Sequence, residues 1–215
     1  MGTSTSSSGH YSTAVPDHRV RDAYSRRARE YIDLFGSIDS TAEVDRALLL
    51  GWSRTLTGRV LDVGCGPGQW TAFLKAAGVD AVGVDPVPEF IDQARSSHPD
   101  VEFRLGRASS LDEPSGGVGG ILAWFSLIHS TPADVDVALR EFARCLRAGG
   151  GLAVGYFAGP ALAPFDHAVT TAYFWPPDLL AEHLGAAGFQ IADSTVRSEA
   201  GARSVGTIIA ERIDS

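Results

Sequence analysis

The sequence predicts an α/β fold: a mostly parallel sheet of seven strands, with one antiparallel strand at the carboxyl-terminal end and helices on both faces. Short apolar runs alternate with amphipathic helical patterns along most of the chain, and this alternation is typical of a parallel sheet that helices cover on both sides. The last two apolar runs have no helix between them, so they are expected to form an antiparallel pair. A length of 215 residues suits a single domain with a substantial core.

Two helical stretches precede the first expected strand. In the second stretch, Val44, Leu48 and Leu49 recur at helical spacing and form an apolar face. Residues 1–16 are rich in serine and have neither a basic start nor an apolar core, so we interpret them as a disordered tail and not as a signal peptide. Residues 17–215 are expected to form the single domain.

Seven apolar runs are expected to form the strands, and helical patterns lie between most of them. The expected strands are Arg59–Val63, Ala81–Val84, Val101–Leu105, Gly120–Trp124, Leu152–Phe157, Phe189–Val196 and Ser204–Arg212. One helix is expected to follow the glycine run at Gln69, and another to start at Pro88, since proline suits the first turn. A third helix is expected from Ala133 to Arg147, where glycines follow, and a fourth within residues 176–188.

The most informative segment is the glycine-rich turn after the first expected strand. Gly64, Gly66 and Gly68 alternate with other residues, directly after Asp62 and Val63. Glycine lets a ligand approach the main chain closely, and open α/β sheets bind ligands at the carboxyl ends of their strands. Dinucleotide-binding folds favour the different spacing G-x-G-x-x-G, and a carboxylate at this place would repel a pyrophosphate. Asp62 would instead suit a ligand that carries an ammonium group.

A second carboxylate, Asp85, ends the next apolar run, at a separation suited to hydrogen bonds with the two hydroxyls of a ribose. The segments V-L-D-V-G-C-G-P-G and V-G-V-D together resemble motif I and the acidic loop of class I S-adenosylmethionine (SAM)-dependent methyltransferases, in the branch of the ubiquinone and menaquinone methyltransferases, which act on small molecules. The resemblance implies a Rossmann-like sheet, SAM as the methyl donor and S-adenosylhomocysteine (SAH) as the product.

The resemblance also implies a set of cofactor-binding residues. They are Tyr24, Arg29, Asp62, Gly64, Cys65, Gly66, Gly68, Asp85, Pro86, Ala108, Ser109, Trp124 and Phe125. In the family, an acidic residue followed by alanine contacts the adenine, and the matching positions here are Arg107 and Ala108. Because arginine replaces the acid, the backbone of Ala108 or the side chain of Ser109 could supply the hydrogen-bond acceptor. Tyr24 or Arg29 could bind the carboxylate of the cofactor.

The segment after the fourth expected strand resembles motif IV of small-molecule methyltransferases. It includes Trp124 and Phe125, and an aromatic ring beside a sulfonium gains a cation–π attraction, although either ring could instead belong to the core. His129 follows, near the place where the acceptor is expected. A neutral imidazole could take a proton from the acceptor; alternatively, His129 caps the loop or contacts the cofactor.

A segment rich in proline, glycine and aromatic residues follows the fifth expected strand. In the family, this region and the N-terminal helices form a lid over the acceptor. The expected walls of an acceptor pocket are Tyr156, Phe157, His167, Tyr173 and Trp175. Each of these residues could alone serve packing, but as a cluster they favour a partly apolar or aromatic acceptor.

Composition limits the expected partners. The formal net charge of −8 argues against a nucleic-acid partner, and no apolar stretch is long enough for a membrane span. Cys65 and Cys145 are too few for a disulfide framework or a zinc site, so we expect no metal and a cytoplasmic location. The acceptor is thus expected to be a small molecule, and the protein a monomer or a homodimer.

Three functions remain open at this point. The first is transfer of a methyl group from SAM to a small molecule by in-line displacement, in which alignment of the reacting atoms supplies much of the acceleration. A protein or a tRNA is a less favoured acceptor because the chain is acidic. The second function is a module that binds SAM or SAH without catalysis. The third is an enzyme that uses NAD or a nucleotide sugar.

Overall fold

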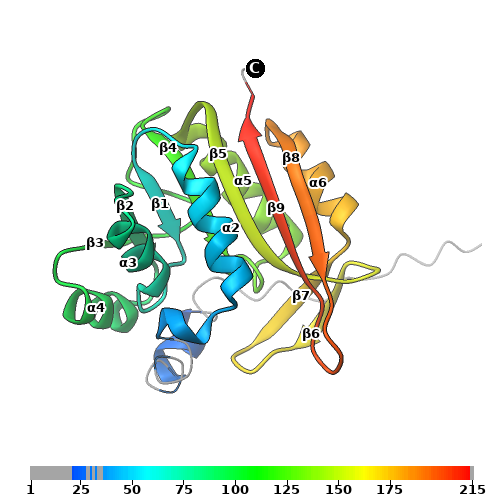
Figure 1. Ribbon diagram of the computed structural model, residues 1–215. Helices are drawn as coiled ribbons and strands as arrows, with labels where there is room; N and C mark the ends of the chain where they lie inside the picture. Colours follow the sequence, from blue (N-terminus) through cyan, green and yellow to red (C-terminus); the bar gives the residue numbers. More distant parts are fainter. Residues whose placement is uncertain (1–20, 28–29, 31, 33–35, 214–215) are drawn as a thin grey trace, which may run out of the picture.

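The computed structural model describes residues 21–27, 30, 32 and 36–213. These residues fold into a sheet of nine strands with helices on both faces (Figure 1). The predicted α/β architecture is therefore confirmed. The expected N-terminal tail and Arg29, an expected cofactor ligand, lie outside the described residues.

Five parallel strands form the centre of the sheet. In spatial order they are β3 (Glu102–Leu105), β2 (Ala81–Asp85), β1 (Val60–Val63), β4 (Val118–Trp124) and β5 (Leu146–Ala158). β1 and β2 are buried along their whole length, as expected for strands that helices cover on both faces. Because the five strands are parallel, their carboxyl ends lie at one edge of the sheet, at the lower side in Figure 1.

The carboxyl-terminal strands form the antiparallel pair that the sequence predicts. β9 (Val205–Arg212) runs antiparallel to β5, and β8 (Phe189–Arg197) runs antiparallel to β9. Their polar link is too short to hold a crossover helix, which is why the second strand must turn back on the first.

Two strands of the sheet are missing from the sequence-based prediction. β6 (Ala163–Asp166) and β7 (Thr171–Trp175) form a hairpin, and β7 pairs with β5 at two positions, so the sheet has nine strands instead of seven. β6 is an edge strand that contains Pro164, and proline is tolerated at a sheet edge because its missing N–H is not needed there. The expected lid is thus partly built from sheet.

The helices lie on the two faces of the sheet. They are α2 (Glu43–Arg54), α3 (Gln69–Ala76), α4 (Pro88–Ser97), α5 (Pro132–Cys145) and α6 (Pro177–Ala186), with a short 3-10 turn, η1 (Ile38–Ser40). In Figure 1, α2 and α3 lie in front of the sheet, and α5 and α6 lie behind it. Among the described residues, no helix is both long and apolar enough to span a bilayer.

Local sequence signals explain where α5 begins but not where it ends. Its N-cap Thr131 accepts a hydrogen bond from the backbone N–H of Asp134, and proline occupies the first turn, as capping rules predict. The helix ends at Cys145, two residues before the predicted end, because Leu146 already pairs with Val118 of the neighbouring strand. A long-range pairing thus overrides the helical pattern.

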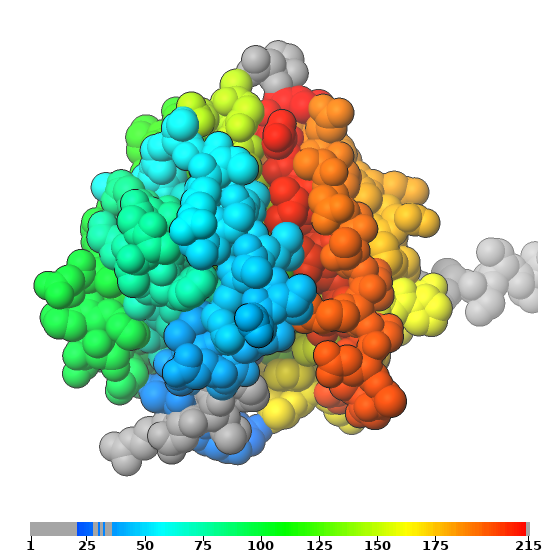
Figure 2. All heavy atoms as spheres, viewed as in Figure 1, coloured from blue at the N-terminus to red at the C-terminus, as the bar shows by residue number. Residues whose placement is uncertain are grey.

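An ion pair joins the front helix layer to the carboxyl-terminal strands. Arg197 at the end of β8 donates two hydrogen bonds, of 2.7 and 3.1 Å, to the carboxylate of Asp45 in α2. Figure 2 shows that the atoms of α2 and those of β8 and β9 adjoin on this face. Beneath them, Leu49 and Trp52 of α2 pack on the sheet. The ion pair and the apolar contacts together fix α2 against this face of the sheet.

Candidate cofactor site

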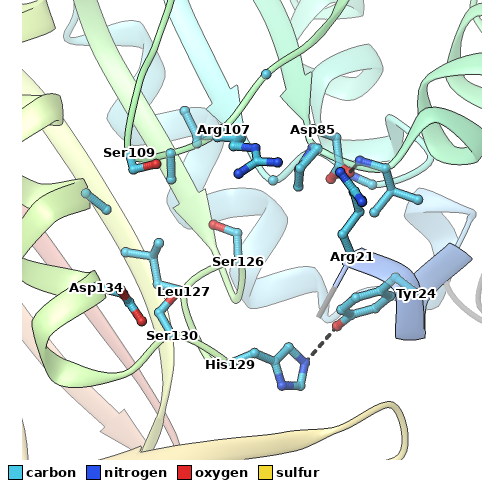
Figure 3. Close-up of a pocket in the computed structure, with 18 of the residues that line it drawn as sticks. Arg21, Tyr24, Asp85, Arg107, Ser109, Ser126, Leu127, His129, Ser130 and Asp134 are labelled. Atoms are coloured by element: carbon cyan, nitrogen blue, oxygen red, sulfur yellow. Dashed lines mark hydrogen bonds between the residues drawn. The ribbon is translucent and has the colours of Figure 1, made fainter. Parts of the chain in front are cut away.

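A cavity opens at the carboxyl ends of the parallel strands, where open α/β sheets bind ligands (Figure 3). The loops after β1, β2, β3 and β4 form its walls, and the helical residues 21–27 contribute Arg21 and Tyr24. Most of the expected cofactor-binding residues line it: Tyr24, Gly64, Gly66, Asp85, Pro86, Ala108, Ser109, Trp124 and Phe125. The cavity thus joins segments that lie far apart in the sequence.

The glycine-rich turn after β1 brings the main chain against the cavity. Gly64 has a φ of +77°, and a Cβ atom on it would lie 2.2 Å from the Cβ of Ser126 after β4. Only glycine fits this close approach between the ends of two neighbouring strands. Gly68 has a structural role instead, because a Cβ atom there would lie 2.6 Å from the ring of Phe103. Gly68 does not line the cavity.

Asp85 forms hydrogen bonds with the glycine-rich turn and also lines the cavity. Its Oδ2 accepts a hydrogen bond of 2.9 Å from the backbone N–H of Gly66, and its Oδ1 accepts one of 2.8 Å from the N–H of Val87. The side chain is 5% exposed, and this burial raises the pKa of Asp85 to about 6. Asp85 thus lies on the cavity wall, and its role beside a ribose stays a prediction.

The structure places Asp62 behind the turn and not on the cavity wall. The carboxylate is 2% exposed and accepts a 2.7 Å hydrogen bond from the hydroxyl of Thr71 in α3. Burial, with a further contribution from the charge of Asp85, raises the pKa of Asp62 to about 7. Asp62 therefore does not line this cavity, and its expected effect on an ammonium group stays a prediction. Cys65 is likewise buried and lies outside the wall.

The two buried carboxylates favour a cationic ligand. Within the described part of the chain, no lysine, arginine or histidine forms an ion pair with Asp62 or Asp85. Buried charges without partners are costly, and a cation in the cavity would lower that cost. A diphosphate would raise it. This arrangement supports a sulfonium compound over a dinucleotide.

Aromatic rings crowd the end of β4. The ring of Trp124 packs edge-on against Trp70 and Phe125, with centroids 6.0 and 5.5 Å apart. Phe125 has a φ of +54°, a conformation that is rare for a bulky residue and is found most often at functional sites. Both rings line the cavity, so they can face a bound cation.

His129 is held at both of its ring nitrogens. Nδ1 lies 2.8 Å from the carbonyl oxygen of Thr171, which can only accept, so Nδ1 carries the proton. Nε2 lies 2.9 Å from the hydroxyl of Tyr24 and accepts its hydrogen bond (Figure 3). Burial lowers the pKa of His129 to about 4, and nearby His167 acts in the same direction. His129 is therefore neutral at physiological pH and links residues 21–27 to β7.

The residues expected to form the acceptor walls do not line this cavity. Tyr156 and Trp175 are 3% and 2% exposed and belong to the main core. Tyr173 is partly buried against the same core. Phe157 and His167 lie behind the cavity wall, since their rings contact Phe125 and His129 at centroid distances of 5.5 and 5.1 Å. None of the five lines the cavity, so they support its wall instead of forming it.

The position of Trp175 gives a first testable prediction. Replacing Trp175 with alanine is expected to lower the free energy of unfolding by about 3–5 kcal/mol, the usual cost of removing a large core side chain. The affinity for SAM is expected to stay unchanged. Urea denaturation and calorimetry check the two results. A variant of unchanged stability would show that Trp175 is not part of the core.

Several wall residues escaped the sequence-based prediction. They are Arg21, Ser126, Leu127, Ser130 and Asp134. The hydroxyl of Ser126 is buried, and no hydrogen-bond partner is recorded for it within the described residues. A buried polar group without a partner is uncommon, and because Ser126 lines the cavity its hydroxyl is available to a ligand there. The one available sequence signal for Ser126 was its place just behind the end of β4, which borders the cavity.

Comparison with known proteins shows which proteins this domain is similar to. Residues 60–150 match a family described as a methyltransferase domain. A demethylmenaquinone methyltransferase of Beutenbergia cavernae is 34% identical over 108 residues, which cover 50% of this chain and 44% of that protein. The chain spans less than half the length of curated relatives such as this one.

Solved structures share the fold over nearly the whole chain. The 1,6-didemethyltoxoflavin-N1-methyltransferase of Burkholderia thailandensis, solved with 1,6-didemethyltoxoflavin and SAH, has a TM-score of 0.78 at 24% identity, covering 96% of this chain and 94% of that one. The [4+2]-cyclase SpnF has a TM-score of 0.79 at 20% identity, covering 94% and 99%. Fold and cavity define an α/β domain with a cavity at its strand ends. More particularly, the part of the chain from β1 into β5 is similar to methyltransferase domains.

Proposed function

We propose that the protein transfers the methyl group of SAM to a small-molecule acceptor. The observation that carries the proposal is the pair of buried carboxylates at the strand ends, Asp62 and Asp85, which form no ion pair with any described residue. The relatives of this chain include a demethylmenaquinone methyltransferase and a ubiquinone-biosynthesis O-methyltransferase, which supports a small acceptor. The net charge of −8 argues against a nucleic acid in this role.

The wall residues suggest how SAM would lie. Asp85 would accept hydrogen bonds from the ribose hydroxyls, and the turn at Gly64 and Gly66 would face the methionine part. The rings of Trp124 and Phe125 would then face the sulfonium, where a cation–π attraction is worth roughly 1–2 kcal/mol when water is excluded. SAM supplies an electrophilic methyl carbon and a neutral thioether as leaving group.

The main task of the protein is then to align the acceptor with the methyl group. Placement of two reactants in a near-attack geometry can supply about 7–11 kcal/mol of the barrier. We propose that His129 serves this alignment and is not a general base. Both of its nitrogens are engaged, and it holds the hydroxyl of Tyr24, which lines the cavity. In these terms His129 is a positioning residue.

A pH profile tests this role. A general base must be neutral to act, so activity would fall as pH decreases through its pKa. With a pKa of about 4, His129 is neutral throughout pH 5.5–8. We expect His129→Gln to lower kcat about tenfold while the shape of the profile at saturating SAM stays as in the wild type. Tyr24→Phe should lower kcat similarly, because both changes release the same hydrogen bond. A wild-type kcat in Tyr24→Phe, together with a loss of kcat in His129→Gln, would contradict the positioning role.

The proposed function itself is tested with methyl-labelled SAM. The full chain is incubated with labelled SAM and a panel of phenols, quinols, carboxylic acids and amines, and the release of SAH is measured. We expect SAH release with at least one small-molecule class. Tight SAM binding without methyl loss to any class would instead favour a module that binds the nucleoside without catalysis.

A further inference from the structure

The cavity continues past Asp85 toward the first turns of α5. At this end, Leu127, Ser130 and Asp134 come from the segment after β4, and Ala108 and Ser109 come from the loop after β3. Figure 3 shows Asp134 and Ser130 on the same side of the cavity as Ser109, away from Tyr24. If Asp85 holds the ribose, this end is the space that remains for a nucleobase.

Adenine makes a specific demand on such a space. Its exocyclic amine is a hydrogen-bond donor and needs an acceptor, whereas its ring nitrogens accept. Arg107, the first charged residue of the loop after β3, has only donor groups, so its side chain cannot accept from the amine. The hydroxyl of Ser109 in the same loop is able to accept, but a carboxylate elsewhere in the wall would form the stronger hydrogen bond with the amine.

Asp134 is the one carboxylate that lines this end of the cavity within the described residues. Its position is fixed by the cap of α5: the hydroxyl of Thr131 donates a 2.6 Å hydrogen bond to Oδ2 of Asp134, and the backbone N–H of Asp134 donates to the same hydroxyl at 3.3 Å. In the described part of the chain, no hydrogen bond is recorded for Oδ1. That oxygen is the one carboxylate acceptor without a recognised donor at the nucleobase end of the described wall.

We propose that Asp134 binds the exocyclic amine of the cofactor's adenine, so that α5 and not the loop after β3 selects adenine over other bases. The proposal rests on SAM being the ligand of this cavity. Specificity of this kind is strong when a site is built around one hydrogen bond, because the wrong base leaves a polar group of the site without a partner.

A pair of nucleosides tests the assignment. SAH carries the amine, and S-inosylhomocysteine carries a carbonyl oxygen at the same place. We expect the wild type to bind SAH at least tenfold more tightly than the inosine analogue. Asp134→Ala should reduce this ratio to about twofold or less while binding the inosine analogue as well as the wild type does, which also shows that the variant is folded.

Asp92→Ala is the matched control, because Asp92 is an exposed carboxylate on another helix and does not line the cavity. It should keep the wild-type ratio. An unchanged ratio in Asp134→Ala would overturn the assignment to Asp134 and leave the proposed function intact. Failure of the wild type to bind either nucleoside would instead overturn the proposed function, and this inference with it.

Discussion

Replacing Asp85 with alanine is expected to weaken SAM binding at least tenfold. The carboxylate lines the cavity, and each of its oxygens also accepts a backbone N–H, from Gly66 and Val87. A hydrogen bond to a charged group is worth about 1.5–3 kcal/mol, which corresponds to a factor of roughly 10–150 in affinity. The substitution removes the ribose contact and also releases the turn that faces the methionine part. Titration calorimetry with SAM measures the effect.

Asp80→Ala is the matched control for Asp85→Ala. Asp80 lies directly before β2, but its side chain is 54% exposed and pairs only at the surface with Arg59 and Lys75. Such surface pairs contribute little, so the control should bind SAM as the wild type does. If Asp85→Ala retained the wild-type dissociation constant, Asp85 would have no place in the ribose site.

Replacing Gly64 with alanine is expected to abolish SAM binding, with a dissociation constant more than 100-fold higher. The new Cβ would lie 2.2 Å from the Cβ of Ser126, and the residue has a φ of +77°. Strain of an L-residue in this conformation costs about 1–2 kcal/mol, and overpacking adds roughly 1–3 kcal/mol. The ends of β1 and β4 must therefore move apart, which displaces the main chain that would face the cofactor.

Two further variants separate clash from strain. Gly78→Ala introduces a side chain at a φ of +90° with no atom within 4 Å of the new Cβ, so it should lower stability by about 1–2 kcal/mol without changing SAM affinity. Adding Ser126→Gly to Gly64→Ala removes the clashing atom and should recover part of the stability. Circular dichroism and urea denaturation follow both effects. Wild-type affinity in Gly64→Ala would show that the cofactor does not approach this turn.

The structural features that depend on residues close together in the sequence were predicted best. The seven main strands, the antiparallel end and the turn at Gly64 all follow from local patterns, and so does the position of Asp85. The β6–β7 hairpin could not be predicted in this way, because its short, proline-containing edge strand is defined by pairing with distant residues. The contact between Gly64 and Ser126 is likewise visible only when β1 and β4 lie side by side.

One error could have been avoided. Tyr156 and Phe157 are consecutive residues of one strand, and side chains of consecutive strand residues point to opposite faces. They could not both line one pocket, and the structure places Tyr156 in the core. Asp62 is different: its side chain meets Thr71 of α3, a contact that no local pattern reveals. Strand alternation settles the face of a residue, but not what covers that face.

The central claim is that this cavity takes a sulfonium nucleoside because the two buried carboxylates beside it have no ion-pair partner in the part of the chain that the structure describes. Calorimetry with SAM and with NAD, at pH 5.5 and pH 7.5, tests it most directly. With pKa values of about 7 and 6, Asp62 and Asp85 are largely protonated at pH 5.5, so SAM should bind several-fold more tightly at pH 7.5 and release protons on binding, while NAD should not bind. Binding of NAD without binding of SAM would contradict the claim.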